Sequence, residues 1–164
     1  MYISGAKWGK VENLNTKVGQ MIMFMGEFNH TVDVKGRIIV PSKLREELGD
    51  QFVVTVGLDG CLFVYPLTEW ELFVEQLKTL PGQAQGRKLQ RYFMSLAADC
   101  EVDKQGRFLV PAKLREMAGL DKDVVFAGVI NKIELWSKEK WDEINDFDNM
   151  DDVAECMSEY GLSF

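Results

Sequence analysis

The sequence is short of the residues on which metal sites and disulfide frameworks depend. It has one histidine, His30, and three cysteines, which stand far apart at Cys61, Cys100 and Cys156 and form no C-x-x-C pair. Structural zinc sites take closely spaced cysteine and histidine ligands, and disulfide frameworks take cysteines in pairs. The composition therefore argues against both and fits a reducing compartment, so we expect a cytoplasmic protein.

Recognisable catalytic arrangements are missing as well. The sequence contains no P-loop and no glycine-rich dinucleotide-binding fingerprint. Cys61 lies within an apolar run with no identifiable base beside it, which is a poor setting for a reactive thiolate. His30 stands near Asp33, but no serine or cysteine nucleophile in a familiar motif accompanies that pair. We therefore expect a protein that is not an enzyme and that binds no cofactor or metal.

Long apolar runs are absent, which limits where the protein can work. No run approaches the length of about 20 residues needed to cross a bilayer, and the run at 21–25 is too short for the core of a signal peptide. We expect no membrane partner and no export. With 46% apolar and 27% charged residues among 164, the chain has the mixture of one or two ordinary globular domains.

Acidic and basic residues are unevenly distributed along the chain. The formal net charge is −7, and residues 137–164 account for all of it with nine acidic residues and two lysines. Residues 1–136 hold 17 residues of each sign. The acidic balance therefore says little about the main body, which can still present a local basic surface.

What the sequence does contain is an internal repeat. Residues 33–49 read DVKGRIIVPSKLREELG and residues 103–119 read DKQGRFLVPAKLREMAG, with ten of 17 positions identical. After one inserted residue the similarity continues, so that residues 53–70 match residues 124–141 in pattern. Units of about 50 residues are small for independent domains. The two copies are therefore expected to complete one another.

Both units have the same predicted local structure. Asp-x-x-Gly-Arg precedes a short strand, and its glycine permits a tight turn between two strands. A proline ends that strand, and short helices are expected over 42–48 and 112–118. A second hairpin follows, with a strong Asp-Gly turn at 59–60 in the first unit and a weaker Asn-Lys turn at 131–132 in the second.

Helices are expected to separate and follow the units. Thr68 and Glu71 fit a capping box at the start of one of them, and Ser137 is a candidate cap for another. The predicted divisions of the chain are an extension at 1–22 that is either a misplaced start or a flexible arm, a first repeat domain at 27–69, a helical linker at 70–97, a second repeat domain at 98–141, and an acidic helix or tail at 142–164.

The repeated charged residues are the candidates for a binding site, and each stretch at 33–45 and 103–115 carries a net charge of +3. Two roles are open for the repeated arginines. One is a salt bridge to the aspartate four residues earlier, and the other is a contact to DNA, where a guanidinium can bond guanine or clamp phosphate. Both hold if the carboxylate orients an arginine that still reaches outward. The candidate residues are Asp33, Lys35, Arg37, Lys43 and Arg45 in the first unit and Asp103, Lys104, Arg107, Lys113 and Arg115 in the second.

These motifs together resemble a known family. The segments MFMGEFNHTVDVKGRIIVPSKLREELG, GLDGCLFVYPLTEW, CEVDKQGRFLVP and NKIELWSKEKW occur here in the order typical of the MraZ family. The resemblance runs from about residue 23 through the second repeat and into the tail, and it leaves residues 1–22 outside. It is specific because two Asp-x-x-Gly-Arg units and two hairpin-plus-tryptophan segments occur in one chain.

The resemblance implies a fold and an assembly that spacing alone does not show. Each unit is similar to an AbrB/SpoVT-type module, a family in which two modules interleave their hairpins. The expected fold class is therefore α+β, mainly β: a tandem swapped-hairpin β-barrel, formed as a pseudo-dimer within one chain, with flanking helices. The family also implies ring-shaped homo-oligomers, octamers or dodecamers.

The resemblance implies a function as well. MraZ proteins are bacterial transcription regulators of the division and cell-wall gene cluster, and an Asp-x-x-x-Arg motif carries their DNA binding. That motif is intact here as Asp33 with Arg37 and as Asp103 with Arg107. We expect a cytoplasmic, nucleoid-associated, sequence-specific regulator that binds double-stranded DNA at direct repeats upstream of its operon, its own gene included.

The second copy departs from the first within the loop itself. Lys104 and Gln105 stand where the first unit has Val34 and Lys35, so the basic residue moves by one place. We therefore expect the first loop to contribute more to binding.

Two other functions stay open. One is an antitoxin-like interaction module whose acidic tail, with Val153, Met157 and Tyr160 as its apolar points, occupies a basic partner. The other is RNA binding, because the basic stretches, including four cations and no acid at 78–91, suit phosphate of either kind. No aromatic platform accompanies those stretches, which counts against RNA.

Overall fold

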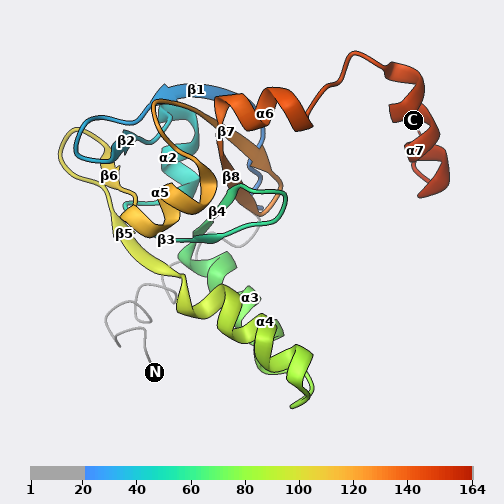
Figure 1. Cartoon of the computed structure of the whole chain (residues 1–164), viewed down its shortest axis with the longest axis horizontal. Coiled ribbons are helices and arrows are strands. Elements are labelled where there is room, and N and C mark those ends of the chain that lie inside the picture. The colour runs from blue at the N-terminus through green and yellow to red at the C-terminus, as the bar shows by residue number, and fades with distance from the viewer. Residues whose placement is uncertain (1–20, 164) are drawn as a thin grey trace.

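A computed structural model describes residues 21–163 and has an α+β fold built mainly of antiparallel strands (Figure 1). The strands are β1 (Glu27–Thr31), β2 (Arg37–Ile39), β3 (Gln51–Val56), β4 (Leu62–Pro66), β5 (Ala98–Glu101), β6 (Arg107–Leu109), β7 (Asp123–Val129) and β8 (Lys132–Ser137). The helices are α2 (Ser42–Leu48), α3 (Leu67–Lys78), α4 (Ala84–Ser95), α5 (Ala112–Ala118), α6 (Lys138–Ile144) and α7 (Met150–Glu159). The expectation of a misplaced start or flexible arm concerns residues 1–22, of which 1–20 lie outside the described residues.

The two sequence repeats exchange strands. One sheet has the order β1-β7-β8-β4-β3-β5, and a second sheet pairs β2 with β6. The first strand of each unit therefore pairs with the other unit, β1 with β7 and β5 with β3. Within the described residues neither unit has a sheet of its own, so the prediction that the copies complete one another is confirmed.

An approximate two-fold axis relates the units. Ile38 faces Phe108 at the centre of the β2–β6 pair, and these two residues hold equivalent positions in the two repeats. Phe63 faces Glu134 at the centre of the β4–β8 pair, again at equivalent positions. The axis passes through both pairs, so the loop, the strands and the short helix after the loop in one repeat have counterparts on the opposite side of the axis.

The core explains why the short helices after the loops form where the sequence predicts them. Leu44 and Leu48 on α2, and Leu114 and Ala118 on α5, are buried at i, i+4 spacing. Removing such apolar side chains from water contributes roughly 25 cal/mol for each Å² buried. These helices therefore anchor the ends of β2 and β6, and with them the loops that precede those strands.

The other turns and caps agree with the sequence in part. The Asp-Gly turn at 59–60 is present with positive φ at both residues, and Ser137 accepts a hydrogen bond from the backbone N–H of Lys140 as the cap of α6. The capping box at Thr68 was wrong, because α3 begins at Leu67 directly after the strand-ending proline and has no side-chain cap. In the second unit, the turn of the β7–β8 hairpin comes one residue earlier than the predicted Asn-Lys turn at 131–132. It begins at Ile130, which has a φ of 68°.

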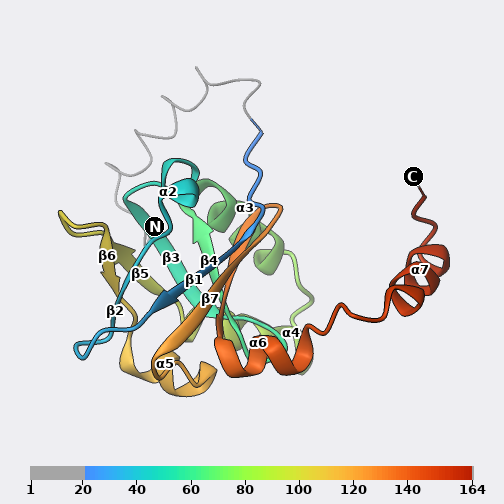
Figure 2. The same ribbon diagram turned by 90° about the horizontal axis from the view of Figure 1, so that it is seen from above.

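Helices α3 and α4 form an arm that projects from one side of the sheet, whereas α6 lies on β7 and β8 (Figure 1). The arm is held by hydrogen bonds from Tyr92 Oη to the Gly57 carbonyl at 3.0 Å and from Thr55 Oγ1 to the Phe93 carbonyl at 2.7 Å. Helix α7 stands clear of the rest of the protein in two perpendicular views (Figures 1 and 2).

Candidate nucleic-acid interface

Pairing of β2 with β6 brings the two repeated loops to the same end of the molecule (Figure 2). We call residues 33–37 the first loop and residues 103–107 the second loop. The N–H of Val40 donates to the carbonyl of Gly106 at 2.9 Å, and the N–H of Val110 donates to the carbonyl of Gly36 at 3.1 Å. Each loop is thus hydrogen-bonded to the strand that follows the other loop, and the two act as one structural unit.

In the first loop, Asp33 holds the turn and the arginine together. Its Oδ1 accepts the backbone N–H groups of Lys35 and Arg37, both at 2.9 Å, and its Oδ2 accepts Nε of Arg37 at 2.7 Å. The backbone N–H of Arg37 is the main cause that lowers the pKa of Asp33. The carboxylate uses only Nε, so both terminal amino groups of Arg37 have no hydrogen-bond partner within residues 21–163.

The second loop repeats this geometry with one added contact. Asp103 accepts the backbone N–H groups of Gln105 and Arg107 at 2.9 Å, and it accepts Nε of Arg107 at 2.8 Å. Its pKa is likewise lowered, first by the Arg107 backbone N–H. Here, however, Oε1 of Gln105 accepts Nη2 of Arg107 at 2.6 Å. One terminal amino group of Arg107 is therefore occupied inside the loop.

The salt-bridge role foreseen for the repeated arginines is confirmed, and it does not bury them. The side chains of Arg37 and Arg107 remain 28% and 27% exposed beside their aspartates. An ion pair through Nε alone leaves a fixed guanidinium edge to face a partner. The geometry thus allows the arginine to be oriented by the carboxylate and to reach outward as well.

Arg45 and Arg115 lie across the two-fold axis against the opposite loop. Each donates a hydrogen bond to a backbone carbonyl of its own unit, at 3.0 and 2.8 Å respectively. The Arg115 guanidinium covers Gly36 so closely that a Cβ there would lie 1.5 Å from Nη1, and the Arg45 guanidinium covers Gly106, where the distance to Nη2 would be 2.1 Å. This reciprocal contact was not foreseen from the sequence, where the identical Lys-Leu-Arg-Glu of both repeats was its only signal.

The four remaining candidate residues are exposed lysines around the loops. None has a carboxylate partner within the described part of the chain, so their charges are available to an anion. They are Lys35 and Lys43 from the first unit and Lys104 and Lys113 from the second.

Other reactive side chains lie in settings that keep them neutral. Burial raises the pKa of Cys61 and of Cys100 to about 12, so both are protonated thiols at neutral pH. Burial also lowers the pKa of His30. Among residues 21–163, no group of three histidine, cysteine or carboxylate side chains is placed to hold a metal ion. In the same part of the chain, no helix is both long enough and apolar enough to cross a membrane.

Comparison with known proteins matches this chain over both repeats. A family model described as "MraZ protein, putative antitoxin-like" matches residues 23–91 and 93–157. A protein of Lachnoclostridium phytofermentans named transcriptional regulator MraZ is 70% identical over 142 residues, which cover 87% of this chain and 100% of that protein. Proteins of the same name from Clostridium beijerinckii and Heliobacterium modesticaldum are 51% and 52% identical, each over 85% of this chain and 100% of their own length. Since these matches include both Asp-x-x-Gly-Arg loops and the linker between them, the chain belongs to the MraZ family.

Proposed function

We propose that this protein is a transcription regulator that binds double-stranded DNA through the first and second loops. The observation that carries the proposal is the pair of arginines, each oriented through Nε by an aspartate and brought together by the β2–β6 pairing. A guanidinium with free terminal amino groups can bond guanine O6 and N7 or clamp a phosphate. The name transcriptional regulator carried by the relatives supports this function and a non-enzymatic role.

The residues divide by role within this proposal. Arg37 reads a base edge, Arg107 gives a weaker or phosphate contact, and the exposed lysines at 35, 43, 104 and 113 bind phosphates. Arg45 and Arg115 contribute by fixing the opposite loop. A direct contact of these two arginines with DNA stays a prediction.

The assembly we propose has three parts. The interleaved strands and the two-stranded sheet form the swapped-hairpin barrel of repeat domains 27–69 and 98–141, copies of the protein form a closed ring, and the ring binds direct repeats upstream of its own operon in the division and cell-wall cluster. A head-to-tail ring presents its loops with one polarity, which suits direct repeats rather than palindromes. Several phosphate contacts at once make the affinity high and salt-dependent. The protein would then act in the cytoplasm at the nucleoid.

The test is a fluorescence-anisotropy titration of the full chain with the duplex from upstream of its own gene, at several salt concentrations. A scrambled duplex of equal length and base composition is the control. We expect preference for the upstream duplex and weaker binding as salt rises. Equal affinity for both duplexes, or none for either, would overturn the proposed reading of DNA sequence.

An antitoxin-like role is the second candidate, and two observations favour it. The matching family is described as antitoxin-like, and α7 is an exposed acidic helix with apolar residues. Under this alternative the tail would occupy a basic partner encoded beside the gene. Co-expression of that neighbour with the full chain, and with a chain ending at residue 145, would show whether a complex forms through the tail.

A further inference from the structure

Helix α7 has no packing partner within the described part of its own chain. None of its ten residues is buried, and Met150, Val153 and the following Tyr160 are 79%, 46% and 81% exposed. Isolated helices shorter than about 12 residues are marginal in water, and most helices in proteins are stabilised by packing of one face. The helix therefore needs a surface to cover its apolar residues.

The surface of α7 has two chemically different sides. Val153, Met157 and Tyr160 recur at i, i+4 and i+7, with Cys156 beside them, and form one apolar stripe. Four acidic residues lie beside this stripe, together with Ala154 and Ser158, and none of the four carboxylates has a basic partner among residues 21–163. The acidic residues are Asp151, Asp152, Glu155 and Glu159.

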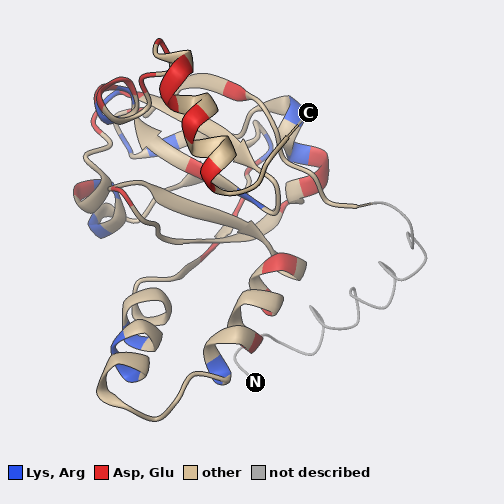
Figure 3. Cartoon of the chain, turned by 90° about the vertical axis from the view of Figure 1, so that its right-hand side faces the viewer, with Lys and Arg blue, Asp and Glu red and all other residues tan. Residues whose placement is uncertain are grey.

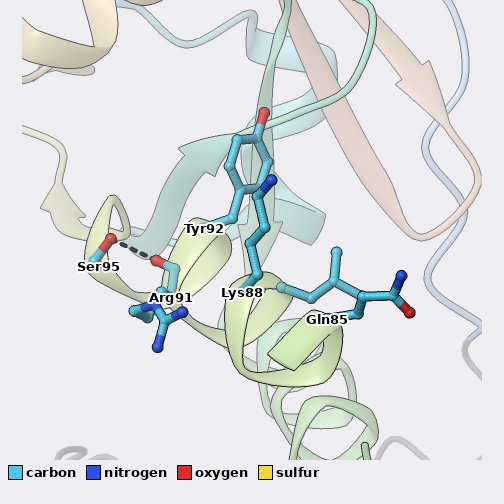
Figure 4. Close-up of a pocket in the computed structure, with 6 residues that line it drawn as sticks. Gln85, Lys88, Arg91, Tyr92 and Ser95 are labelled. Atoms are coloured by element: carbon cyan, nitrogen blue, oxygen red, sulfur yellow. Dashed lines mark hydrogen bonds between the residues drawn. The ribbon is translucent and has the colours of Figure 1, made fainter. Parts of the chain in front are cut away.

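Helix α4 has an outward face of the opposite kind. Leu89 and Tyr92 are 45% and 38% exposed there, and Lys88 and Arg91 beside them have no carboxylate partner within the described residues. The α4 face is a shallow pocket along one side of the helix (Figure 4), lined by Gln85, Lys88, Leu89, Arg91, Tyr92 and Ser95. No acidic residue occurs in α4.

The charges of the two helices are complementary, as Figure 3 shows, with Asp and Glu alone on α7 and Lys and Arg alone on α4. Both helices also carry apolar residues on the same side as these charges, Leu89 and Tyr92 on α4 and the stripe from Val153 to Tyr160 on α7. An acidic amphipathic helix laid on a basic, partly apolar face buries both stripes and pairs both sets of charges. Residues 1–20 are a poorer match for the α4 face, because they hold three lysines and one acidic residue.

We propose that α7 of one copy of this protein docks on the α4 face of a second copy. In its own chain α7 lies apart from α4 in both perpendicular views (Figures 1 and 2). A contact between two different surfaces is heterologous, and such contacts close into rings when the rotation permits. The inference rests on the proposed ring and names the surface that builds it.

This contact leaves the DNA-binding end free. The first and second loops lie at the opposite side of the molecule from α7 (Figure 1). The contact depends on exposed charge pairs around a small apolar centre, so it should weaken as salt screens those charges. The ring would then loosen at a salt concentration set by α4 and α7, independently of the loops.

The native thiol on α7 provides the test. Cys156 is exposed, whereas Cys61 and Cys100 are buried with pKa raised to about 12, so Cys156 is the thiol available for disulfide exchange. A second cysteine is introduced on the α4 face as Gln85→Cys or, separately, Ser95→Cys. Under mild oxidation of the full chain we expect a ladder of covalent oligomers on a non-reducing gel from at least one of these variants.

Control variants distinguish docking of α7 on a second copy from docking on its own chain. Adding Cys156→Ser should remove the ladder, and Leu72→Cys, which is exposed on α3 and is not among the residues that line the α4 face, should give none. A monomer with an internal disulfide would place α7 on its own chain and overturn the proposal. Absence of any disulfide from both α4 variants would overturn it as well.

Charge exchange gives a second readout that uses no cysteine. The pair Lys88→Glu and Arg91→Glu should lower the mass of the assembly in sedimentation or native mass spectrometry. Adding Glu155→Lys and Glu159→Lys to the same chain should restore it, which a purely structural effect of the α4 changes would not do. Failure of that rescue would contradict the contact between α7 and α4.

Neither the disulfide test nor the charge-exchange test contains DNA. A negative result in them would overturn the proposed contact but would not bear on the proposed function, which the anisotropy titration tests.

Discussion

The first and second loops differ in what surrounds the arginine. Both aspartates bond Nε of their arginine at nearly the same distance, 2.7 and 2.8 Å. In the first loop the terminal amino groups of Arg37 stay unbonded within the described residues, whereas in the second Gln105 takes one of them from Arg107. Both repeats therefore keep the aspartate that orients the arginine through Nε. They differ at the positions between these two residues, and this difference decides whether a terminal amino group of the arginine is already bonded.

That comparison explains why the two loops need not serve equally. A guanidinium that is already bonded by an amide must give up that bond before it can bind a base with both amino groups. The first loop also has Lys35 where the second has this glutamine. We therefore assign the leading role in DNA reading to the first loop, and the following predictions test that assignment.

The largest effect should come from removing each arginine in turn. Arg37→Ala should lower the affinity for the upstream duplex by about ten- to a hundredfold, since a bidentate base contact is worth about 1–3 kcal/mol. Arg107→Ala should lower it by less than about tenfold. Anisotropy with both duplexes measures this, and circular dichroism checks that each variant is folded. A larger loss from Arg107→Ala would reverse the assignment of the leading loop.

The next effect concerns stability and the arginines that cross the axis. Gly36→Ala and Gly106→Ala each place a Cβ on a guanidinium at positive φ, 86° and 77°, and each should lower the free energy of unfolding, by about 1–3 kcal/mol. Gly36 should cost more, because its Cβ would lie closer to the guanidinium. Urea unfolding measures both, with Gly119→Ala as the matched control, because Gly119 also has a positive φ, 64°, but a Cβ there meets nothing within 4 Å. Three equal midpoints would show that the crosswise contact is unimportant.

A smaller effect should follow from exchanging the tip residues. Gln105→Lys frees Nη2 of Arg107 and adds a charge, so the slope of log affinity against log salt should steepen by about 0.9 for one added phosphate contact. Lys35→Gln should make it shallower by a similar amount. An unchanged slope in both variants would mean that the tips do not lie near phosphate.

The smallest effect should appear in acid. Because the backbone N–H of Arg37 lowers the pKa of Asp33, the ionised carboxylate stabilises the fold above its unfolded pKa, near 3.8, and that stabilisation is lost as the pH falls through the lower folded value. Asp33→Asn should therefore be less stable than the wild type at neutral pH, with the difference shrinking below pH 3.8. Unfolding curves at a series of pH values measure this. A difference that stays constant across that window would assign another role to Asp33.

The local structure of the repeats was predictable because it depends on neighbouring residues. Helices α2 and α5 have the predicted bounds, since a proline precedes each and apolar residues at i, i+4 fix the buried side. The aspartate–arginine pair was predictable for the same reason, four residues apart across a glycine turn. The capping box predicted at Thr68 is absent because Pro66 occupies the N-cap position and α3 begins at Leu67.

Contacts between the repeats could not be read from spacing. Arg45 and Gly106 are 61 positions apart in the numbering, and only the strand exchange brings them together. A repeated Lys-Leu-Arg-Glu looks like a solvated basic helix until the opposite loop is placed beneath it. The exchange itself followed from the family resemblance and the small size of each unit, and not from any pattern within a strand.

The central claim is that DNA lies against the two loops, chiefly the first, and a photo-crosslink tests it most directly. Val34 is fully exposed at the tip of the first loop, and a benzophenone-bearing residue in its place leaves Arg37 and Asp33 intact. The same residue is placed at Lys104 and, as a distant control, at the exposed Leu72 on α3. We predict strong crosslinking of the upstream duplex from position 34, weaker crosslinking from 104 and none from 72. Crosslinking from position 72 that equals or exceeds that from position 34 would contradict the account.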